Sequence, residues 1–355
     1  MAVAVLYKEK ISTSKGFRRF IAALIVFLLL LVVFSFHIGR FSKIQLSSVV
    51  RILINQIVPV FSETWTRVDE SVVLNLRFPR IIASIIVGAS LAVSGAAYQS
   101  LFSNPVASSD SLGVSSSAAF GAVLGFLLNL NVLLVKGLAF LVGCFSVFSI
   151  YFIAAKMNNK RNLTVFLILI GMIVSSFFGA ALSVLKYVAD PIDQLPKITY
   201  WLMGSMSNVR LSDITYCCVF FIIGITPLFL LRWRLNLLVL SDSEAKSVGE
   251  NINFLRLITI ICATLLTASA IAMTGGISWI GLVIPHIARL LVGNDSRRLM
   301  PASAILGGIF LLAMDDIARS VSVYELPISI LTSLFGAPVF FGILIWRRKQ
   351  IINDD

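Results

Sequence analysis

Long apolar runs follow one another along this chain, separated by short polar stretches that hold most of its charged residues. A helix needs about 20 mainly apolar residues to cross the hydrocarbon layer, so runs of this length predict transmembrane helices. The runs are continuous and do not alternate, which excludes the strands of a membrane β-barrel. The pattern predicts an all-α polytopic membrane protein with about ten spans, at residues 20–36, 80–101, 108–130, 132–155, 163–187, 214–231, 257–273, 277–292, 301–317 and 326–346.

Basic residues at the two ends of the chain predict its orientation. Lys8 and Arg18 precede the first apolar run, and Arg347 and Lys349 follow the last one. Lysine and arginine gather on the cytoplasmic side of membrane proteins. The first run lacks a small-residue cleavage pattern, so we expect it to be a retained span and not a signal peptide. These features predict cytoplasmic tails at 1–19 and 347–355 and a single membrane domain at 20–346.

A polar stretch at 235–256 interrupts the apolar runs. Ser241 to Glu244 fits a capping box, and Gly249 is typical of a helix end. Arg232, Arg234 and Arg256 flank the stretch, which is typical of a cytoplasmic loop. The pattern predicts a short helix that either lies on the lipid headgroups or docks on a cytoplasmic partner, with Ser241, Asp242, Glu244, Ala245, Ser247 and Gly249 as the contact residues.

Small residues recur at every fourth position in two of the predicted spans. Such stripes allow the backbones of two helices to approach closely. They predict either close packing alone or a tight bundle around a lined path, and Gln99 ends the first of the two helices. The stripes consist of Ser84, Gly88, Ala92 and Ala96 in one span and of Gly171, Ser175, Gly179 and Ser183 in the other.

The apolar run at 277–292 is too short to cross a membrane easily. Gly275 and Gly276 precede it, and Pro285 lies in its middle. We therefore expect this run to be tilted or partly unwound. Unwound backbone at this depth is tolerated where protein or a water-filled cavity satisfies its polar groups.

Charged residues near the last two spans need partners, because a charge at mid-membrane costs roughly 2.5 to 3.5 kcal/mol. Asp315 and Arg319 are four residues apart and could pair on one helix face. Alternatively, Arg319 could point outward together with Arg77 and Arg80, which flank Phe78-Pro79. Arginines in such a setting suit bidentate recognition of carboxylates or of lipid phosphate.

Composition excludes several classes of function. The net charge is +12, but the basic residues gather at the ends of apolar runs, which indicates contacts with lipid and not with nucleic acid. The four cysteines and two histidines lack the spacing of a metal site or a disulfide framework. No Gly-Lys pair occurs, so the Walker A phosphate loop is missing and any ATP must be bound by another chain. We expect no catalytic activity, no metal and no cofactor.

Several ordered motifs resemble one transporter family. They are RFPRIIASIIVGASLAVSGAAYQSLFSNPVASSDSLGVSSSAAFG at 77–121, TYWLMGSMS at 199–207, GGISWIGLVIPHIARLLVGNDSRRLMP at 275–301, MDDIARS at 314–320 and ELPISILTSLFGAPVFF at 325–341. Together they resemble the permease subunits of type II ABC importers for iron-siderophore, haem and cobalamin. The resemblance extends from about residue 77 to the C-terminus.

The resemblance implies an assembly in the inner membrane of a bacterium. A second permease copy, most simply in a homodimer, two cytoplasmic ATP-binding subunits and a periplasmic or lipid-anchored substrate-binding protein would complete it. It implies that the binding protein docks at Arg77, Arg80 and Arg319, and that the 235–256 segment couples to the ATPase. The implied cytoplasmic gate consists of Asn104, Pro105 and Val106 with Asn162 and Thr164.

The function implied by the resemblance is import of an iron chelate, a ferric siderophore or haem, by ATP-driven alternating access. Cobalamin, or molybdate and tungstate, are alternative substrates within the family. An ion-coupled secondary transporter is an alternative from another class, but it would need an acidic or histidine relay inside the membrane. A membrane-embedded enzyme would need paired carboxylates or a histidine cluster within the spans. The spans offer little of either kind.

Overall fold

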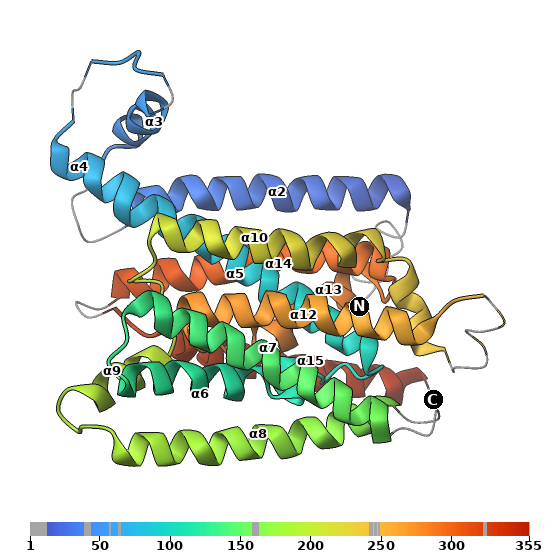
Figure 1. Cartoon of the computed structure of the whole chain (residues 1–355). Helices are drawn as coiled ribbons and strands as arrows, with labels where there is room; N and C mark the ends of the chain where they lie inside the picture. The colour runs from blue at the N-terminus through green and yellow to red at the C-terminus, as the bar shows by residue number, and fades with distance from the viewer. Residues whose placement is uncertain are drawn as a thin grey trace.

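The computed structural model describes residues 13–38, 44–56, 58–62, 65–157, 163–240, 244, 247, 249–321 and 325–354, with side chains of the last helix to residue 345. Every secondary-structure element among the described residues is a helix (Figure 1). Its elements are α2 Ser14–His37, α3 Leu46–Asn55, α4 Arg67–Ser71, the π-helical turn η1 Val72–Arg77, α5 Phe78–Leu101, η2 Ser109–Leu112, α6 Val114–Leu127, α7 Val132–Met157, α8 Leu163–Val188, α9 Gln194–Leu202, α10 Leu211–Leu230, η3 Arg234–Val239, α12 Ile252–Thr274, α13 Ile280–Val292, α14 Ser296–Val321 and α15 Ile328–Asp354.

Among the described residues, eight helices are long and apolar enough to cross a membrane. These are α2, the continuous helix Arg67–Leu101 that contains α5, α7, α8, α10, α12, α14 and α15. The apolar helices α6 and α13 are shorter, with 14 and 13 residues. The predicted all-helical polytopic architecture is confirmed, and the predicted number of ten spans is reached when α6 and α13 are included.

The helices form a bundle with two distinct ends. The start of α2, the end of α15 and the segment around η3 lie at one end, which we call the η3 end (Figure 1). Helices α3, α4 and α9 lie at the other end, which we call the α9 end. Helix α2 begins at Ser14, within the predicted tail at 1–19, and α15 continues to Asp354, within the predicted tail at 347–355. Backbone hydrogen bonding thus continues past the last apolar residues of each span.

Helix α5 lies at the centre of the bundle and packs on α10, α12, α13 and α14. A Cβ atom on Gly88 would stand 2.2 Å from the carbonyl oxygen of Gly307 in α14, and one on Gly95 would stand 1.9 Å from that of Gly281 in α13. The backbone of α5 is therefore in contact with that of α14 at the first crossing and with that of α13 at the second. This is the close approach that the first small-residue stripe predicts.

The predicted interruption before α13 is also present. Residues 275–279 are not helical, and Gly275 and Trp279 have φ angles of +76° and +73°. Thr274 is the last residue of α12, so no later helical turn supplies a donor to its carbonyl oxygen. That oxygen accepts a hydrogen bond from the backbone N–H of Ser205 at 2.8 Å. Protein groups thus satisfy the unwound backbone, as a membrane interior requires.

The glycine crossing yields a stability prediction. Gly307→Ala places a Cβ 2.2 Å from the Gly88 carbonyl oxygen, so α5 and α14 must separate, at a cost of about 1–3 kcal/mol for overpacking. We expect a lower melting temperature of the purified protein in detergent. Gly137→Ala in α7 is the control, because nothing lies within 4 Å of its added Cβ. Equal melting temperatures of the two variants would contradict the backbone contact between α5 and α14 at Gly307.

Candidate functional site

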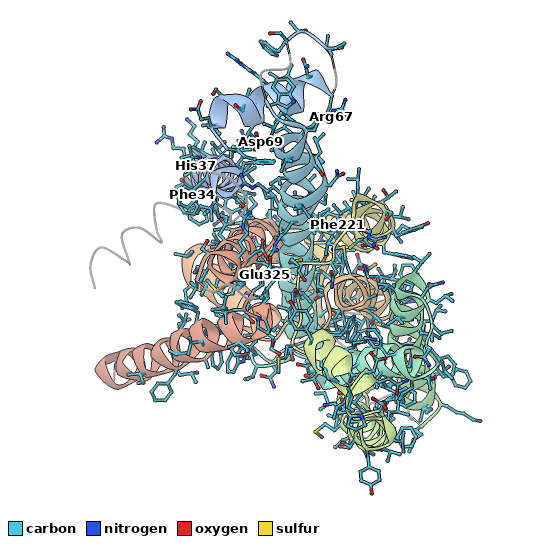
Figure 2. All side chains as sticks on the ribbon, turned by 90° about the vertical axis from the view of Figure 1, so that its left-hand side faces the viewer. Phe34, His37, Arg67, Asp69, Phe221 and Glu325 are labelled. Atoms are coloured by element: carbon cyan, nitrogen blue, oxygen red, sulfur yellow. The ribbon has the colours of Figure 1, made fainter. Side chains whose placement is uncertain are left out.

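A buried group of charged residues lies between α5, α14 and the start of α15. The guanidinium of Arg80 donates to both carboxylate oxygens of Asp315, with Nε at 2.9 and 2.8 Å, and to both of Glu325, with Nη1 at 2.8 and 2.9 Å. The Asp315 side chain is fully buried, whereas the Glu325 side chain is 28% exposed. Arg80 thus ties α14 and α15 to α5 at the α9 end. Glu325 lies near the middle of the bundle viewed from this end (Figure 2).

A second part of the same group ties α2 to α14. Arg319 forms an ion pair with Asp316 and donates to the hydroxyl of Ser35 at 2.6 Å. Ser35 in turn donates to Asp316 at 2.7 Å. Arg77 donates to the backbone carbonyl of Phe36, so α2 also reaches the start of α5. Three arginines face three carboxylates here, and the group is balanced in charge.

The predicted Asp315–Arg319 pair on one helix face is wrong. Asp315 pairs with Arg80, and Arg319 pairs with Asp316, three residues before it. The crossing helices place Arg80 of α5 opposite Asp315 and Ser35 of α2 opposite Arg319. Arg77, Arg80 and Arg319 are all buried in the chain. Their predicted docking to a binding protein stays a prediction.

At the η3 end, part of the predicted coupling helix lies outside the described residues, namely Ser241, Asp242, Ser243, Ala245, Lys246 and Val248. Glu244 and Ser247 are helical and exposed, and the Ser247 hydroxyl donates to the Glu244 carbonyl at 2.6 Å. Gly249 has φ +79°, the left-handed conformation that ends a helix. Arg234 and Glu250 form an ion pair at 3.2 Å across the base of this segment.

The flanking arginines of this segment differ in environment. Arg232 is exposed, as expected for a residue at the headgroups. Arg256 is buried in the second turn of α12, where the helix already packs within the bundle. Its predicted place at the membrane surface stays a prediction.

Asn236 in η3 fixes the start of α14. Its amide nitrogen donates to Asp295 at 2.8 Å, and its amide oxygen accepts from the backbone N–H of Ser296 at 2.8 Å. Burial alone would raise the pKa of Asp295, but hydrogen bonds from the Arg297 N–H and Asn236, with the nearby charges of Arg297 and Arg298, hold this pKa below its ordinary value. Asp295 therefore contributes stability at neutral pH, which is lost as the pH falls through its lowered pKa.

The loop after α5 carries the first predicted gate residues. Asn104, Pro105 and Val106 are all exposed. The Asn104 side chain accepts from the Val106 N–H at 3.0 Å, and the Asn104 N–H donates to the carbonyl oxygen of Gln99 at 3.1 Å. The loop is thus a compact exposed turn at the η3 end. Thr164 lies half-buried in the first turn of α8, and Asn162 lies outside the described residues.

Gln99 is buried and holds α13 against α5. Its side-chain nitrogen donates to the carbonyl oxygens of Gly281 and Leu282 at 3.4 and 3.3 Å, and its oxygen accepts from Arg289. Together with Gly88 and Ala92, it serves packing between helices. The α5 stripe is therefore buried against α13 and α14 in this chain, and a role of these residues along a lined path stays a prediction.

The second stripe, on α8, divides into two halves. A Cβ on Gly171 would stand 2.3 Å from the Ser111 carbonyl oxygen, and Ser175 donates to the Asp110 carbonyl at 3.3 Å, so this half packs on η2. Nothing lies within 4 Å of a Cβ on Gly179, and Ser183 is exposed. The face of α8 that carries Gly179 and Ser183 is therefore uncovered within a single chain, whereas Leu182 and Leu185 of the same half pack on the cluster of Val123 and Ile198.

Three separate segments meet at the start of α15. The backbone N–H groups of Ile328 and Ser329 donate to the carbonyl oxygens of Gly204 and Met203 at 3.0 and 3.2 Å. Gly204 has φ +70°, and a Cβ there would stand 2.4 Å from the Gly276 carbonyl oxygen. The turn after α9, the unwound residues before α13 and the start of α15 thus form one joint, which we call the serine junction.

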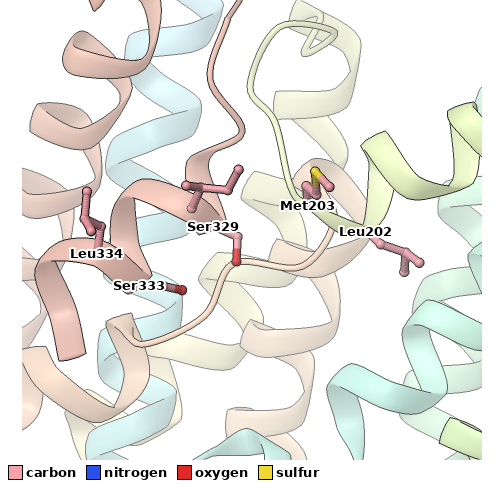
Figure 3. Close-up of a pocket in the computed structure, with 6 residues that line it drawn as sticks. Leu202, Met203, Ser329, Ser333 and Leu334 are labelled. Atoms are coloured by element: carbon pink, nitrogen blue, oxygen red, sulfur yellow. The ribbon is translucent and has the colours of Figure 1, made fainter.

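Hydroxyl groups are concentrated at the serine junction. The hydroxyls of Tyr200, Ser205 and Ser207 are joined by hydrogen bonds of 2.8 to 3.5 Å. The Ser329 hydroxyl donates to the Ser278 hydroxyl at 3.5 Å. A shallow cavity, widely open to the surroundings and with a volume of about 550 Å³, lies beside them (Figure 3). Its lining is neutral, with apolar and serine side chains, and consists of Leu202, Met203, Ser329, Ile330, Ser333 and Leu334.

Sequence reasoning did not identify this cavity. The motifs at 199–207, 275–301 and 325–341 contain the three segments of the serine junction, but these segments are far apart along the chain. The signal that could have identified it is the combination of glycine and serine in each of them. Those residues allow the three backbones to meet and leave hydroxyls at the joint.

These features define an all-helical membrane permease with a neutral cavity at one end and an exposed polar segment at the other. The model of the FecCD transport family matches residues 27–347. The chain is 39% identical over 283 residues to the molybdate import system permease MolB of Haemophilus influenzae, covering 80% of this chain and 83% of that protein. It is 38% identical over 280 residues to the "Probable iron chelatin transport system permease protein" of Helicobacter pylori, covering 78% of this chain and 83% of that protein.

The fold agrees with these relatives. A solved metal-chelate type ABC transporter in an inward-facing conformation superposes with a TM-score of 0.82 at 35% identity, covering 93% of this chain and 99% of that one. The chain belongs to the FecCD transport family, whose members are permease subunits of type II ABC importers. ATP hydrolysis belongs to a separate subunit.

The buried charged group yields the second prediction. Asp315→Asn removes the fully buried carboxylate and leaves Arg80 with the partly exposed Glu325 alone; breaking a buried pair costs about 3–5 kcal/mol, of which Glu325 offsets a part. We expect a large loss of thermal stability in lipid nanodiscs. Lys197→Gln is the control, because its pair with Asp193 is exposed and worth at most about 1 kcal/mol. If both variants melt alike, the charged group does not hold α5 to α14.

Proposed function

We propose that this chain is the permease of a binding-protein-dependent importer for an iron chelate. The observation that carries the proposal is the cavity at the serine junction, whose lining residues are apolar or hydroxyl-bearing and uncharged. Weak, neutral contacts suit a bulky chelate that must bind and then leave. A path for a small oxyanion such as molybdate would be expected to present basic groups. The iron chelatin permease of Helicobacter pylori, a relative of comparable identity, supports the same substrate class.

We propose that the permease works as a pair of identical subunits. The uncovered face of α8 around Gly179 and Ser183, and the exposed apolar residues of α15, among them Leu334 and Phe341, provide surface for a second copy. Such a pair would place two copies of the serine junction side by side. Chelate would then pass between the subunits, as alternating access requires.

In this proposal the α9 end faces outward and the η3 end faces the cytoplasm. Two ATP-binding subunits contact Glu244, Ser247 and their neighbours at the η3 end. The Arg234–Glu250 pair holds the base of that segment, and the Asn236–Asp295 contact passes its movement to α14. The buried charged group keeps the outer end closed, which fits the inward-facing state of the similar solved transporter.

The substrate is tested by uptake of ⁵⁵Fe-labelled siderophores, ⁵⁵Fe-haem, labelled cobalamin and ⁹⁹Mo-molybdate in cells with and without this chain. We expect loss of iron uptake alone. Ser333→Trp, which fills the cavity, should reduce iron uptake by at least tenfold, whereas Ser47→Trp on the exposed face of α3 should leave it unchanged. Loss of molybdate or cobalamin uptake with iron uptake intact would overturn the substrate assignment.

Docking of the binding protein is the second test. We propose that a partner carboxylate replaces Glu325 on Arg80, because Glu325 has the most exposed side chain of the three carboxylates in the charged group. Removal of the competing charge in Glu325→Gln should then tighten binding of the cognate binding protein severalfold at low salt. The Asp193→Asn variant, on the exposed surface of the same end, should not change it. Unchanged or weaker binding of Glu325→Gln would remove Arg80 from the docking site.

A further inference from the structure

The α9 end carries a helix whose surface is not explained by transport. Helix α3 follows the first span and lies crosswise to the bundle: it is seen nearly end-on in Figure 1, where α2 runs across the view. It contacts α2 and η1 and lies beside the outer end of the bundle. A helix in this position runs along the membrane surface.

The apolar residues of α3 cover more than the surface that packs on the protein. Val49 and Ile52 are buried against the chain, in a cluster that includes Phe36 and Val73. Leu46, Val50 and Ile54, spaced four apart on one face, are 43%, 46% and 40% exposed. Ser47, Arg51 and Asn55 occupy the neighbouring polar face, about 100° around the helix. A wide apolar arc with only half its width on protein is the pattern of an interfacial helix.

The loop after α3 extends this apolar surface. The Asn55 side chain accepts from the N–H groups of Val60 and Phe61 at 3.0 and 2.9 Å and donates to the Phe61 carbonyl at 2.9 Å. These bonds hold the loop in a turn that exposes Val58, Val60 and Phe61. The exposed apolar residues are therefore presented by a fixed structure.

A basic group borders the same surface. The Arg51 guanidinium lies over the Phe61 ring, 5.9 Å from its centroid. An arginine beside an aromatic ring at the edge of an apolar surface is suited to lipid phosphate, since its stem can lie on the apolar side while its charge reaches the headgroups. Helix α2, which α3 contacts, also exposes apolar residues such as Val33 and Phe34, which a membrane-spanning helix presents to lipid.

We propose that α3 and its loop form a membrane-surface anchor that lies in the lipid leaflet at the α9 end. Leu46, Val50, Ile54 and Phe61 enter the boundary between headgroups and acyl chains, roughly 5–10 Å deep. Arg51 binds lipid phosphate at that level. The anchor fixes η1, and with it Arg77 at the start of α5, relative to the membrane while the bundle moves. The occupant of this surface is lipid and not a protein partner.

The proposal is tested by depth-dependent quenching in nanodiscs that contain anionic phosphatidylglycerol. Single cysteines at Val50 and Phe61 are labelled with the fluorophore NBD in a chain whose four native cysteines are alanine, and Ser47→Cys is the matched control on the polar face. We expect blue-shifted emission at Val50 and Phe61, with at least twofold stronger quenching by lipids doxyl-labelled near the headgroup than at Ser47. Water-like emission at Val50 and Phe61 overturns the proposal.

A second measurement uses the chain with its native cysteines, in case the cysteine-free variant does not insert. Benzoylphenylalanine at position 50 should form lipid adducts on illumination, detected by mass spectrometry, and at position 47 it should form few. If position 50 instead forms adducts with an added binding protein, the surface is a protein-docking site and the lipid assignment is wrong. If position 50 forms no adduct with either, the surface is water-exposed and the proposal also fails.

Discussion

Backbone contact between α5 and α14 is the constraint on which the rest of this structure depends. Within a membrane, apolar side chains gain little by leaving lipid for protein, so helices associate through close packing and polar contacts. Gly88 and Gly307 provide that packing. Arg80 precedes Gly88 by eight residues, and Asp315 follows Gly307 by eight. Since the helices run in opposite directions, the crossing brings this pair together about two turns away. The buried charges are therefore compatible with the membrane because the glycines place them opposite each other.

The same helix connects the two ends of the molecule. Helix α14 begins at the Asn236–Asp295 contact, next to the exposed polar segment, and ends at the charged group that joins α2, α5 and α15. In the proposed coupling, movement of η3 would pass along a helix that also holds the charged group at the α9 end. Helix α13, which Gln99 attaches to α5, shares the unwound residues of the serine junction. In this arrangement a displacement at the η3 end can reach the cavity without passing through a flexible loop.

The features that depend on one helix at a time could be predicted from the sequence. Hydropathy located the spans, four-residue spacing identified Gly88 and Ala92, and Gly275-Gly276 indicated the unwound segment before α13. Contacts between helices could not be predicted in this way. Spacing alone assigned Asp315 to Arg319, because it shows which residues share a face and not which helix lies opposite. The serine junction escaped prediction for the same reason, since its residues come from three segments that only the folded bundle brings together.

The central claim is that the serine-junction cavity is part of the transport route for an iron chelate. Its most direct test is chemical protection of Ser333→Cys in proteoliposomes that contain the permease, its ATP-binding subunits and its binding protein. The rate of maleimide modification at position 333 is followed by peptide mass spectrometry during turnover. We expect transported ferric chelate to slow this modification severalfold and molybdate to leave it unchanged. Equal rates with and without chelate would contradict the assignment of the cavity to the route.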